Sequence, residues 1–152
     1  PFSGQKGTMW EGGIRVPCIL RWPGRLPSGT VSDRVGITMD LTVSVLTVMR
    51  AGVPESPPLD GIDLIGDLQA GRPAAPRRLF WRSRRGNMTW RAVRDGGMKY
   101  MVEERNGLRT ERLFDLAADP SEKNNLLAVR PDEARRLAMA LAAWEIEVRP
   151  RR

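Results

Sequence analysis

The spacing of apolar positions along the chain predicts strands in some segments and helices in others. Residues 16–22, a short apolar run bounded by prolines, are predicted to form a buried strand. The segment from Asp40 to Gly52 is predicted to form a short helix with Asp40 as its N-cap and Gly52 just past its end. Residues 60–71 predict a second short helix, which Gly71 would close. The apolar side of the first helix would consist of Leu41, Val45 and Val48.

Beyond residue 76 the pattern changes to short strands followed by one long helix. Strand-like segments between residues 79 and 116 are separated by turn sequences, including Asp95-Gly96-Gly97 and Asn106-Gly107. We therefore expect four strands in series that form a small antiparallel meander. The helix is predicted to begin at Pro131 and to stop before Pro150. Its apolar stripe, which we expect to pack on the sheet, is formed by Leu137, Leu141, Trp144 and Val148.

The composition indicates a globular chain of about one domain's length. Of its 152 residues 41% are apolar, which is enough to bury a core. The single cysteine, Cys18, has no partner for an internal disulfide and is expected to be a small core residue. No apolar run approaches the roughly 18 residues that a membrane span requires. We therefore expect no membrane partner.

The net charge of +7 raises the possibility of nucleic-acid binding, because clustered basic side chains neutralise phosphates. Of the 25 basic residues 22 are arginine, and they occur in every segment of the chain. Such an even distribution indicates a general arginine bias instead of a basic patch. We therefore expect no nucleic-acid partner.

The most distinctive local sequence is the stretch of residues 4–17, which places four glycines around Lys6. Glycines allow positive φ and a close backbone approach to a ligand, and a lysine ammonium is a compact charge suited to an oxyanion. The stretch lacks the Gly-Lys-Ser/Thr sequence of a Walker loop. From the residues alone it indicates only a possible anion site.

The same stretch, G-x-K-G-T-x-W-E-G-G-I-R-V-P followed by W-P-G-R, resembles the second signature region of the sulfatases, which hydrolyse sulfate esters. Further along, A-G-V-P, L-D-G-I-D-L, R-A-V-R-D-G-x-x-K-Y and L-F-D-L-A-A-D-P-x-E-x-N-N-L appear in the order expected of a sulfatase carboxyl-terminal portion. The resemblance implies an α/β fold of the alkaline-phosphatase-like type. Residues 1–76 would be the end of the large α/β catalytic domain. Residues 77–152 would be a small C-terminal α+β subdomain, a four-stranded antiparallel sheet packed by the terminal helix.

The resemblance also implies a mechanism of which this chain carries only a part. Sulfatases use a formylglycine made from the first residue of a C/S-x-P-x-R motif, a divalent cation, expected to be Ca²⁺, and histidines that carry protons. This chain has no histidine, and Cys18 is not followed by proline two residues later. We therefore expect the nucleophile and the metal ligands in a missing N-terminal part, with no catalytic or metal-binding residue in this chain. The chain alone should be inactive, and its apolar faces at residues 16–22 and on the first helix should be exposed.

Carried over residue by residue, the resemblance assigns Lys6 to a contact with a sulfate oxygen. Glu11 and Arg15 are four residues apart and are expected to pair and support the loop that presents Lys6. Trp10 has two open alternatives, lining a substrate cleft or packing in the structure. Three residues after the first predicted strand are candidates for substrate selection, namely Asn87, Met88 and Trp90.

Alternatives to a sulfatase remain at this point. A phosphatase or phosphonate hydrolase of the same superfamily would share the tetrahedral geometry of the transferred group. A non-catalytic anion-binding or interaction module could use the basic meander on sulfated or phosphorylated polymers. The expected partner is a sulfate-ester small molecule or a sulfated glycan. The compartment and the oligomeric state stay open, although the resemblance is compatible with a periplasmic or secreted protein.

Overall fold

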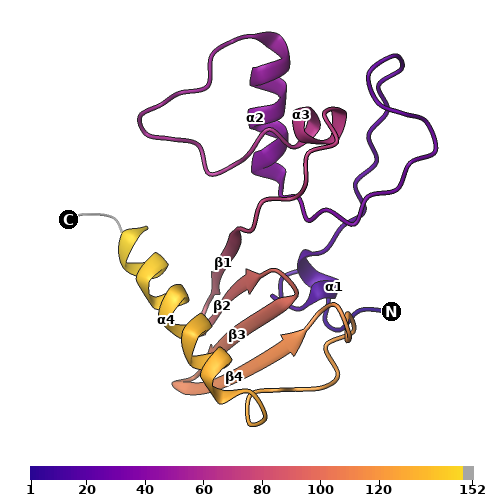
Figure 1. Cartoon of the computed structure of the whole chain (residues 1–152). Coiled ribbons are helices and arrows are strands. Elements are labelled where there is room, and N and C mark those ends of the chain that lie inside the picture. The colour runs from indigo at the N-terminus through magenta and orange to yellow at the C-terminus, as the bar shows by residue number, and fades with distance from the viewer. Residues whose placement is uncertain (149–152) are drawn as a thin grey trace. The chain divides into compact units, whose positions relative to one another are not determined.

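The computed structural model describes residues 1–148, which form two compact units (Figure 1). The sheet unit comprises Pro1–Pro17 and the chain from Pro76 onward, and the helical unit comprises Cys18–Ala75. Both Pro76 and residues 1–17 lie with the sheet unit. The assignment of residues 1–76 to a catalytic domain stays a prediction. The elements are α1 (Glu11–Ile14), α2 (Thr38–Met49), α3 (Leu64–Gln69), β1 (Arg78–Arg85), β2 (Met88–Asp95), β3 (Met98–Arg105), β4 (Leu108–Asp115) and α4 (Pro131–Glu147).

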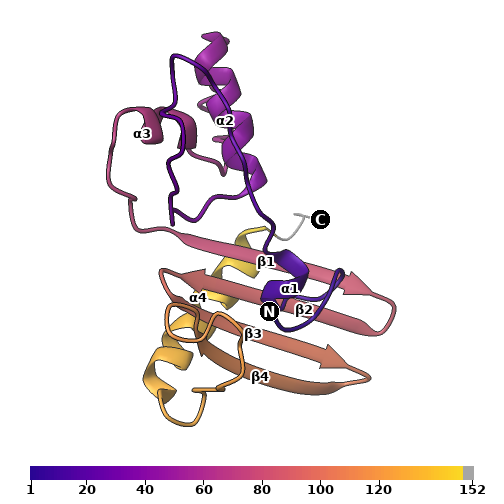
Figure 2. The same ribbon diagram turned by 90° about the vertical axis from the view of Figure 1, so that its right-hand side faces the viewer.

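The sheet is an antiparallel meander with strand order β1-β2-β3-β4, which confirms the predicted four strands in series (Figure 2). Each hairpin has a two-residue turn, since Arg85 pairs with Met88, Asp95 with Met98 and Arg105 with Leu108. The last turn has φ of 51° at Asn106 and 80° at Gly107. Positive φ at both turn residues matches the twist of the flanking strands, so the Asn-Gly sequence fixes the strand register.

Successive strand residues face opposite sides of the sheet, and each side has its own cover. Helix α4 covers one face of the sheet (Figure 2). The ring of Phe80 stacks there on that of Trp144, with 5.1 Å between centroids. The predicted stripe of α4 is confirmed at Leu137 and Leu141 but is wrong at Val148, which is 47% exposed. Val148 is the C-cap of α4, because the helix ends at Glu147. The buried cluster on this face consists of Val93, Met98, Tyr100, Val102, Leu113, Ala134, Leu137 and Leu141.

The opposite face is covered by the N-terminal segment that includes α1 (Figure 1). Met9 is buried there, and Trp10 and Ile14 pack beside it. The strand residues of this cluster are Trp90, Ala92, Met101 and Phe114, with Leu116 following β4. The N-terminal segment is therefore part of the core of the sheet unit.

In the helical unit, α2 packs on α3 through a buried face that is partly polar. The carboxylate of Asp40 accepts hydrogen bonds from the backbone N–H of Ile37 at 2.8 Å and of Ile62 at 3.0 Å. Ser44 is also buried and accepts from the N–H of Ile65 at 3.1 Å. One prediction for this helix is wrong. Asp40 is the third helical residue instead of the N-cap, because α2 begins at Thr38.

The apolar side that the sequence predicts for α2 is exposed in this chain, as expected. Val45 and Val48 are 50% and 43% exposed, whereas Val43, which lies outside that side, is buried. The hydrogen bonds to the segment around α3 select the buried face, and these depend on tertiary structure. The second short helix is confirmed as α3, and Gly71 follows it with φ of 61°.

Residues 16–22 do not form the predicted strand. Within the described residues they pair with no strand, and Val16 and Ile19 are 74% and 91% exposed. Cys18 is exposed as well, so its expected core position is wrong. An apolar run forms a strand only where a neighbouring strand supplies hydrogen bonds, and no such neighbour is present here. None of the described helices has the length and apolar character that crossing a membrane requires.

Candidate functional site

The glycine-rich stretch forms a compact loop at residues 3–15, which we call the signature loop. The N–H of Gly12 donates to the carbonyl of Ser3 at 2.8 Å and closes the loop. Gly7 has φ of 94°, a conformation that side chains rarely adopt. A Cβ at Gly13 would lie only 2.3 Å from the carbonyl oxygen of Thr8, so the backbone can pass there only without a side chain. These glycines allow the backbone of the loop to follow one tight path.

Lys6 lies at the exposed part of the signature loop. Across residues 1–148, no carboxylate forms an ion pair with its ammonium. The guanidinium of Arg85, from the end of β1, lies beside the next loop residue, since a Cβ at Gly7 would be 3.6 Å from its Nη1. The loop therefore presents an unpaired ammonium at Lys6 and has the guanidinium of Arg85 beside Gly7, and both cations favour an anion.

A buried lysine holds the other side of the loop to the sheet. Lys99 on β3 is fully buried, and its Nζ donates to Glu11 Oε1 at 2.9 Å and to Glu122 Oε1 at 2.8 Å. Glu122 Oε2 in turn accepts from the backbone N–H of Glu11 at 2.6 Å. Buried charges are tolerated only when they are paired and hydrogen-bonded. Here the ammonium donates to both carboxylates, and three of the four carboxylate oxygens accept a hydrogen bond.

Lys99 and Glu122 were not among the residues predicted for the site. One local feature could have indicated Lys99, because a lysine interrupts the otherwise apolar strand sequence M-K-Y-M-V. Its cross-strand partner is Phe114, which faces the N-terminal segment. A lysine at an inward register position of a central strand is rarely buried without an acidic partner.

The expected pair of Glu11 and Arg15 is present at the distance limit, with Arg15 Nη1 4.0 Å from Glu11 Oε2. Arg94 of β2 lies at a similar distance of 3.9 Å from the same oxygen. Burial lowers the pKa of the Arg94 guanidinium, and the charge of Glu11 opposes this effect. The principal partner of Glu11 is Lys99. The role of Glu11 and Arg15 in supporting a sulfate site stays a prediction.

Trp10 packs on the sheet, which is one of its two alternatives. Its ring lies 5.4 Å from that of Phe114 between centroids, and the guanidinium of Arg112 lies 5.1 Å from its centre. Among the candidates for substrate selection, the prediction for Trp90 is wrong, because its side chain is buried in the core and only 5% exposed. Asn87 is exposed and donates a hydrogen bond to Asn106 of the neighbouring turn.

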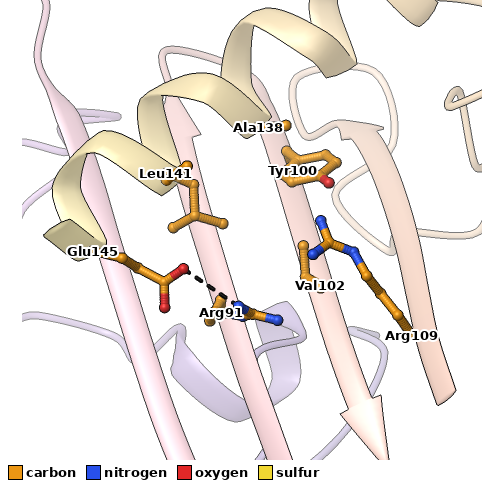
Figure 3. Close-up of a pocket in the computed structure, with 8 residues that line it drawn as sticks. Arg91, Tyr100, Val102, Arg109, Ala138, Leu141 and Glu145 are labelled. Atoms are coloured by element: carbon orange, nitrogen blue, oxygen red, sulfur yellow. Dashed lines mark hydrogen bonds and ion pairs between the residues drawn. The ribbon is translucent and has the colours of Figure 1, made fainter. Parts of the chain in front are cut away.

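A small cavity of about 60 Å³ lies between α4 and the sheet (Figure 3). Arg91, Arg109 and Glu145 point into it beside Tyr100, and Arg91 Nη1 lies 3.3 Å from Glu145 Oε2. Arg109 Nε is 2.5 Å from Glu111 Oε1, so both arginines are paired with carboxylates. A cavity of this size has room for only about two waters. It is part of the packing of α4.

The packing of α4 on the sheet can be tested by titrating Tyr100, because it is the only tyrosine in the chain. Burial, together with the hydrogen bond that its hydroxyl donates to Glu111 at 2.6 Å, raises its pKa to about 12. An ultraviolet titration of tyrosinate should therefore have a midpoint near 12 instead of about 10. Because the pKa of Tyr100 is raised in the folded state, the contribution of this residue to the free energy of unfolding is complete below about pH 10 and is lost as the pH rises through about 12.

The matched variants for this titration are Tyr100→Phe, which should abolish the signal, and Glu111→Gln, which should lower the midpoint by removing a neighbouring negative charge. A midpoint near 10 in the folded chain would contradict the packing described here.

The described residues do not fit the metal and nucleophile that the resemblance implies. Within residues 1–148 no group of three or more Cys, His, Asp or Glu side chains could hold a metal ion. Cys18 is exposed and lies outside the nucleophile motif. No catalytic step through a cation or formylglycine is therefore assigned to these residues.

Comparison with known proteins finds sulfatases among the relatives of this chain. No family model matches the chain. N-acetylgalactosamine-6-sulfatase of Canis lupus familiaris is 40% identical over 81 residues, which are 53% of this chain and 15% of the relative. An uncharacterized sulfatase of Schizosaccharomyces pombe is 28% identical over 97% of this chain and 28% of the relative. The resemblance to the sulfatases is confirmed. Human arylsulfatase G is a further sulfatase relative, 32% identical over 55% of this chain and 16% of its own.

Solved sulfatase-type structures share the fold. The crystal structure of Ps i-CgsB in complex with k-i-k-neocarrahexaose matches 95% of this chain with a TM-score of 0.83 at 23% identity, and 32% of that chain is covered. The putative sulfatase yidJ from Bacteroides fragilis matches 69% of this chain and 23% of its own, with a TM-score of 0.55 and 22% identity. The predicted fold class, an α/β fragment with a four-stranded antiparallel sheet and a C-terminal helix, is confirmed. The chain spans less than a third of these relatives and structures.

Proposed function

We propose that this chain is the carboxyl-terminal part of a sulfatase that hydrolyses sulfate esters, and that Lys6 contacts a sulfate oxygen. The observation that carries the proposal is the state of Lys6, an exposed ammonium without a carboxylate partner in the described residues, on a loop with one tight path. Negative charge on the sulfate oxygens is redistributed as the S–O bond breaks. An ammonium at that position would stabilise this charge.

The remaining catalytic groups are proposed to belong to an N-terminal part of the complete protein. The small share of the relatives' length that this chain spans supports that division. The formylglycine nucleophile, the proton carriers and the divalent cation, Ca²⁺, would all be held there. Because the described residues hold no candidate metal cluster, the chain alone is expected to bind anions weakly and to turn over no substrate.

The substrate is proposed to be a small sulfate ester or a sulfated glycan. One relative is named for N-acetylgalactosamine-6-sulfatase activity, and one structural neighbour was solved with a neocarrahexaose. The second cation beside the signature loop, Arg85, favours a substrate with more than one negative charge.

The test is to assay the complete protein on matched aryl sulfate and aryl phosphate esters, beside the 152-residue chain alone. We expect hydrolysis of the sulfate by the complete protein, slower hydrolysis of the phosphate, and no activity in the chain alone. Hydrolysis of only the phosphate would support the phosphatase alternative. A folded, inactive complete protein that binds sulfated polymers would support the interaction module.

A further inference from the structure

Lys99 connects three segments that are distant in sequence. It lies on β3, and its two carboxylate partners come from the signature loop and from the segment that follows β4. Lys99 is fully buried and cannot contact a substrate. We infer that Lys99 is a positioning residue for Lys6, acting through Glu11 and Glu122. The inference rests on the proposed function for the role of Lys6, whereas the attachment of the loop is independent of it.

The signature loop is attached to the segment after β4 on both sides of Lys6 in sequence. Before Lys6, the hydroxyl of Ser3 donates to the carbonyl of Ser121 at 2.6 Å. After Lys6, Glu11 is held by Lys99 and by the bond from its N–H to Glu122. Both ends of the loop are therefore tied to residues 121 and 122, and the ammonium of Lys99 fixes the second of these. A loop held at both ends gives Lys6 a defined position relative to the sheet.

The ammonium of Lys99 is required to hold the signature loop on the sheet, because it lies between the carboxylates of Glu11 and Glu122. Without it, Glu11 and Glu122 would face each other in a buried site with one positive charge fewer. Arg94 and Arg15 approach only the other oxygen of Glu11, at 3.9 and 4.0 Å, and cannot replace it for Glu122. Detachment of the loop relieves this repulsion by exposing Glu11 to water. We therefore expect the loop to open locally more often, against the packing of Met9 and Trp10, while the strands of the sheet stay paired.

The first experiment measures amide hydrogen exchange in the 152-residue chain and its Lys99→Met variant. Exchange of the signature-loop amides should become faster by about tenfold or more through local opening, while exchange in β2 and β3 stays slow. Lys123→Met is the matched control, because that lysine is exposed and lies next to Glu122. If Lys99→Met does not fold, Glu11→Gln tests the same attachment, since it keeps the pair of Lys99 and Glu122. Unchanged loop exchange in the folded variant would overturn the inference.

The second experiment measures hydrolysis of an aryl sulfate by the complete protein with single and double substitutions. Lys99→Met should lower kcat/KM by about 10²-fold, the effect typical of a displaced catalytic contact. In a Lys6→Ala background the same substitution should lower it by less than about threefold, because the contact is already lost. Equal losses in both backgrounds would show a merely structural role and overturn the inference. A wild-type protein without sulfatase activity would overturn the proposed function instead, and the exchange experiment would still decide whether Lys99 attaches the loop.

Discussion

Replacing Lys6 with alanine in the complete protein is expected to lower kcat/KM for an aryl sulfate by about 10²-fold or more. This is the loss that removal of one preorganised oxyanion contact typically causes. The ammonium is exposed and forms no ion pair within the described chain, so its removal leaves the packing intact. The thermal unfolding midpoint should therefore not change, and the loss can be attributed to the site.

Two variants sharpen the interpretation of Lys6. Lys123→Ala removes another exposed lysine of the same sheet unit and should leave kcat/KM unchanged. Lys6→Arg keeps the charge but replaces a compact ammonium with a larger planar group, so only part of the activity should remain. Wild-type activity in Lys6→Ala would show that the loop does not contact the sulfate.

Replacing Lys99 with methionine is expected to lower the free energy of unfolding of the sheet unit by about 3–5 kcal/mol. The methionine fills a similar volume, but two buried carboxylates lose their shared hydrogen-bond donor. A loss of this size is a large part of the stability of a domain. Urea unfolding, followed by tryptophan fluorescence, measures it, since Trp10 and Trp90 lie on the same face of the sheet.

The triple variant with Lys99→Met, Glu11→Gln and Glu122→Gln distinguishes a lost ion pair from a packing defect. It leaves no uncompensated carboxylate in the site, and a glutamine at 122 can still accept from the N–H of residue 11. We expect it to recover much of the lost stability, as replacement of a whole buried ion pair often does. If Lys99→Met alone unfolds in the same urea concentration as wild type, the buried network contributes little.

Lys6 and Lys99 therefore have different roles although both are lysines. The ammonium of Lys6 has no carboxylate partner in the described chain and is available to a ligand, whereas that of Lys99 donates hydrogen bonds to two buried carboxylates. Glu11 belongs to the sequence stretch of the first lysine and to the network of the second. This shared residue is the reason that a substitution at Lys99, which is distant in sequence from Lys6, is expected to affect the proposed sulfate contact.

The sequence by itself determined the features that depend on local geometry. The Asn106-Gly107 turn required two residues with positive φ, and Pro131 followed by acidic residues placed the start of α4, so the meander and the helix could be predicted. The ordered motifs around Lys6 carried the resemblance to sulfatases. These features are encoded within about ten residues each, a range over which turn chemistry and periodicity act.

The tertiary structure alone decided which polar and apolar side chains are buried. Residues 16–22 have the pattern of a strand but find no neighbouring strand in the described chain, and α2 buries Asp40 and Ser44 because backbone donors near α3 meet them. Lys99 and Glu11 are 88 residues apart in sequence, and nothing local to either indicates the other. A buried charge is stable only beside its partner, and that proximity is set by the folding of the N-terminal segment onto the sheet.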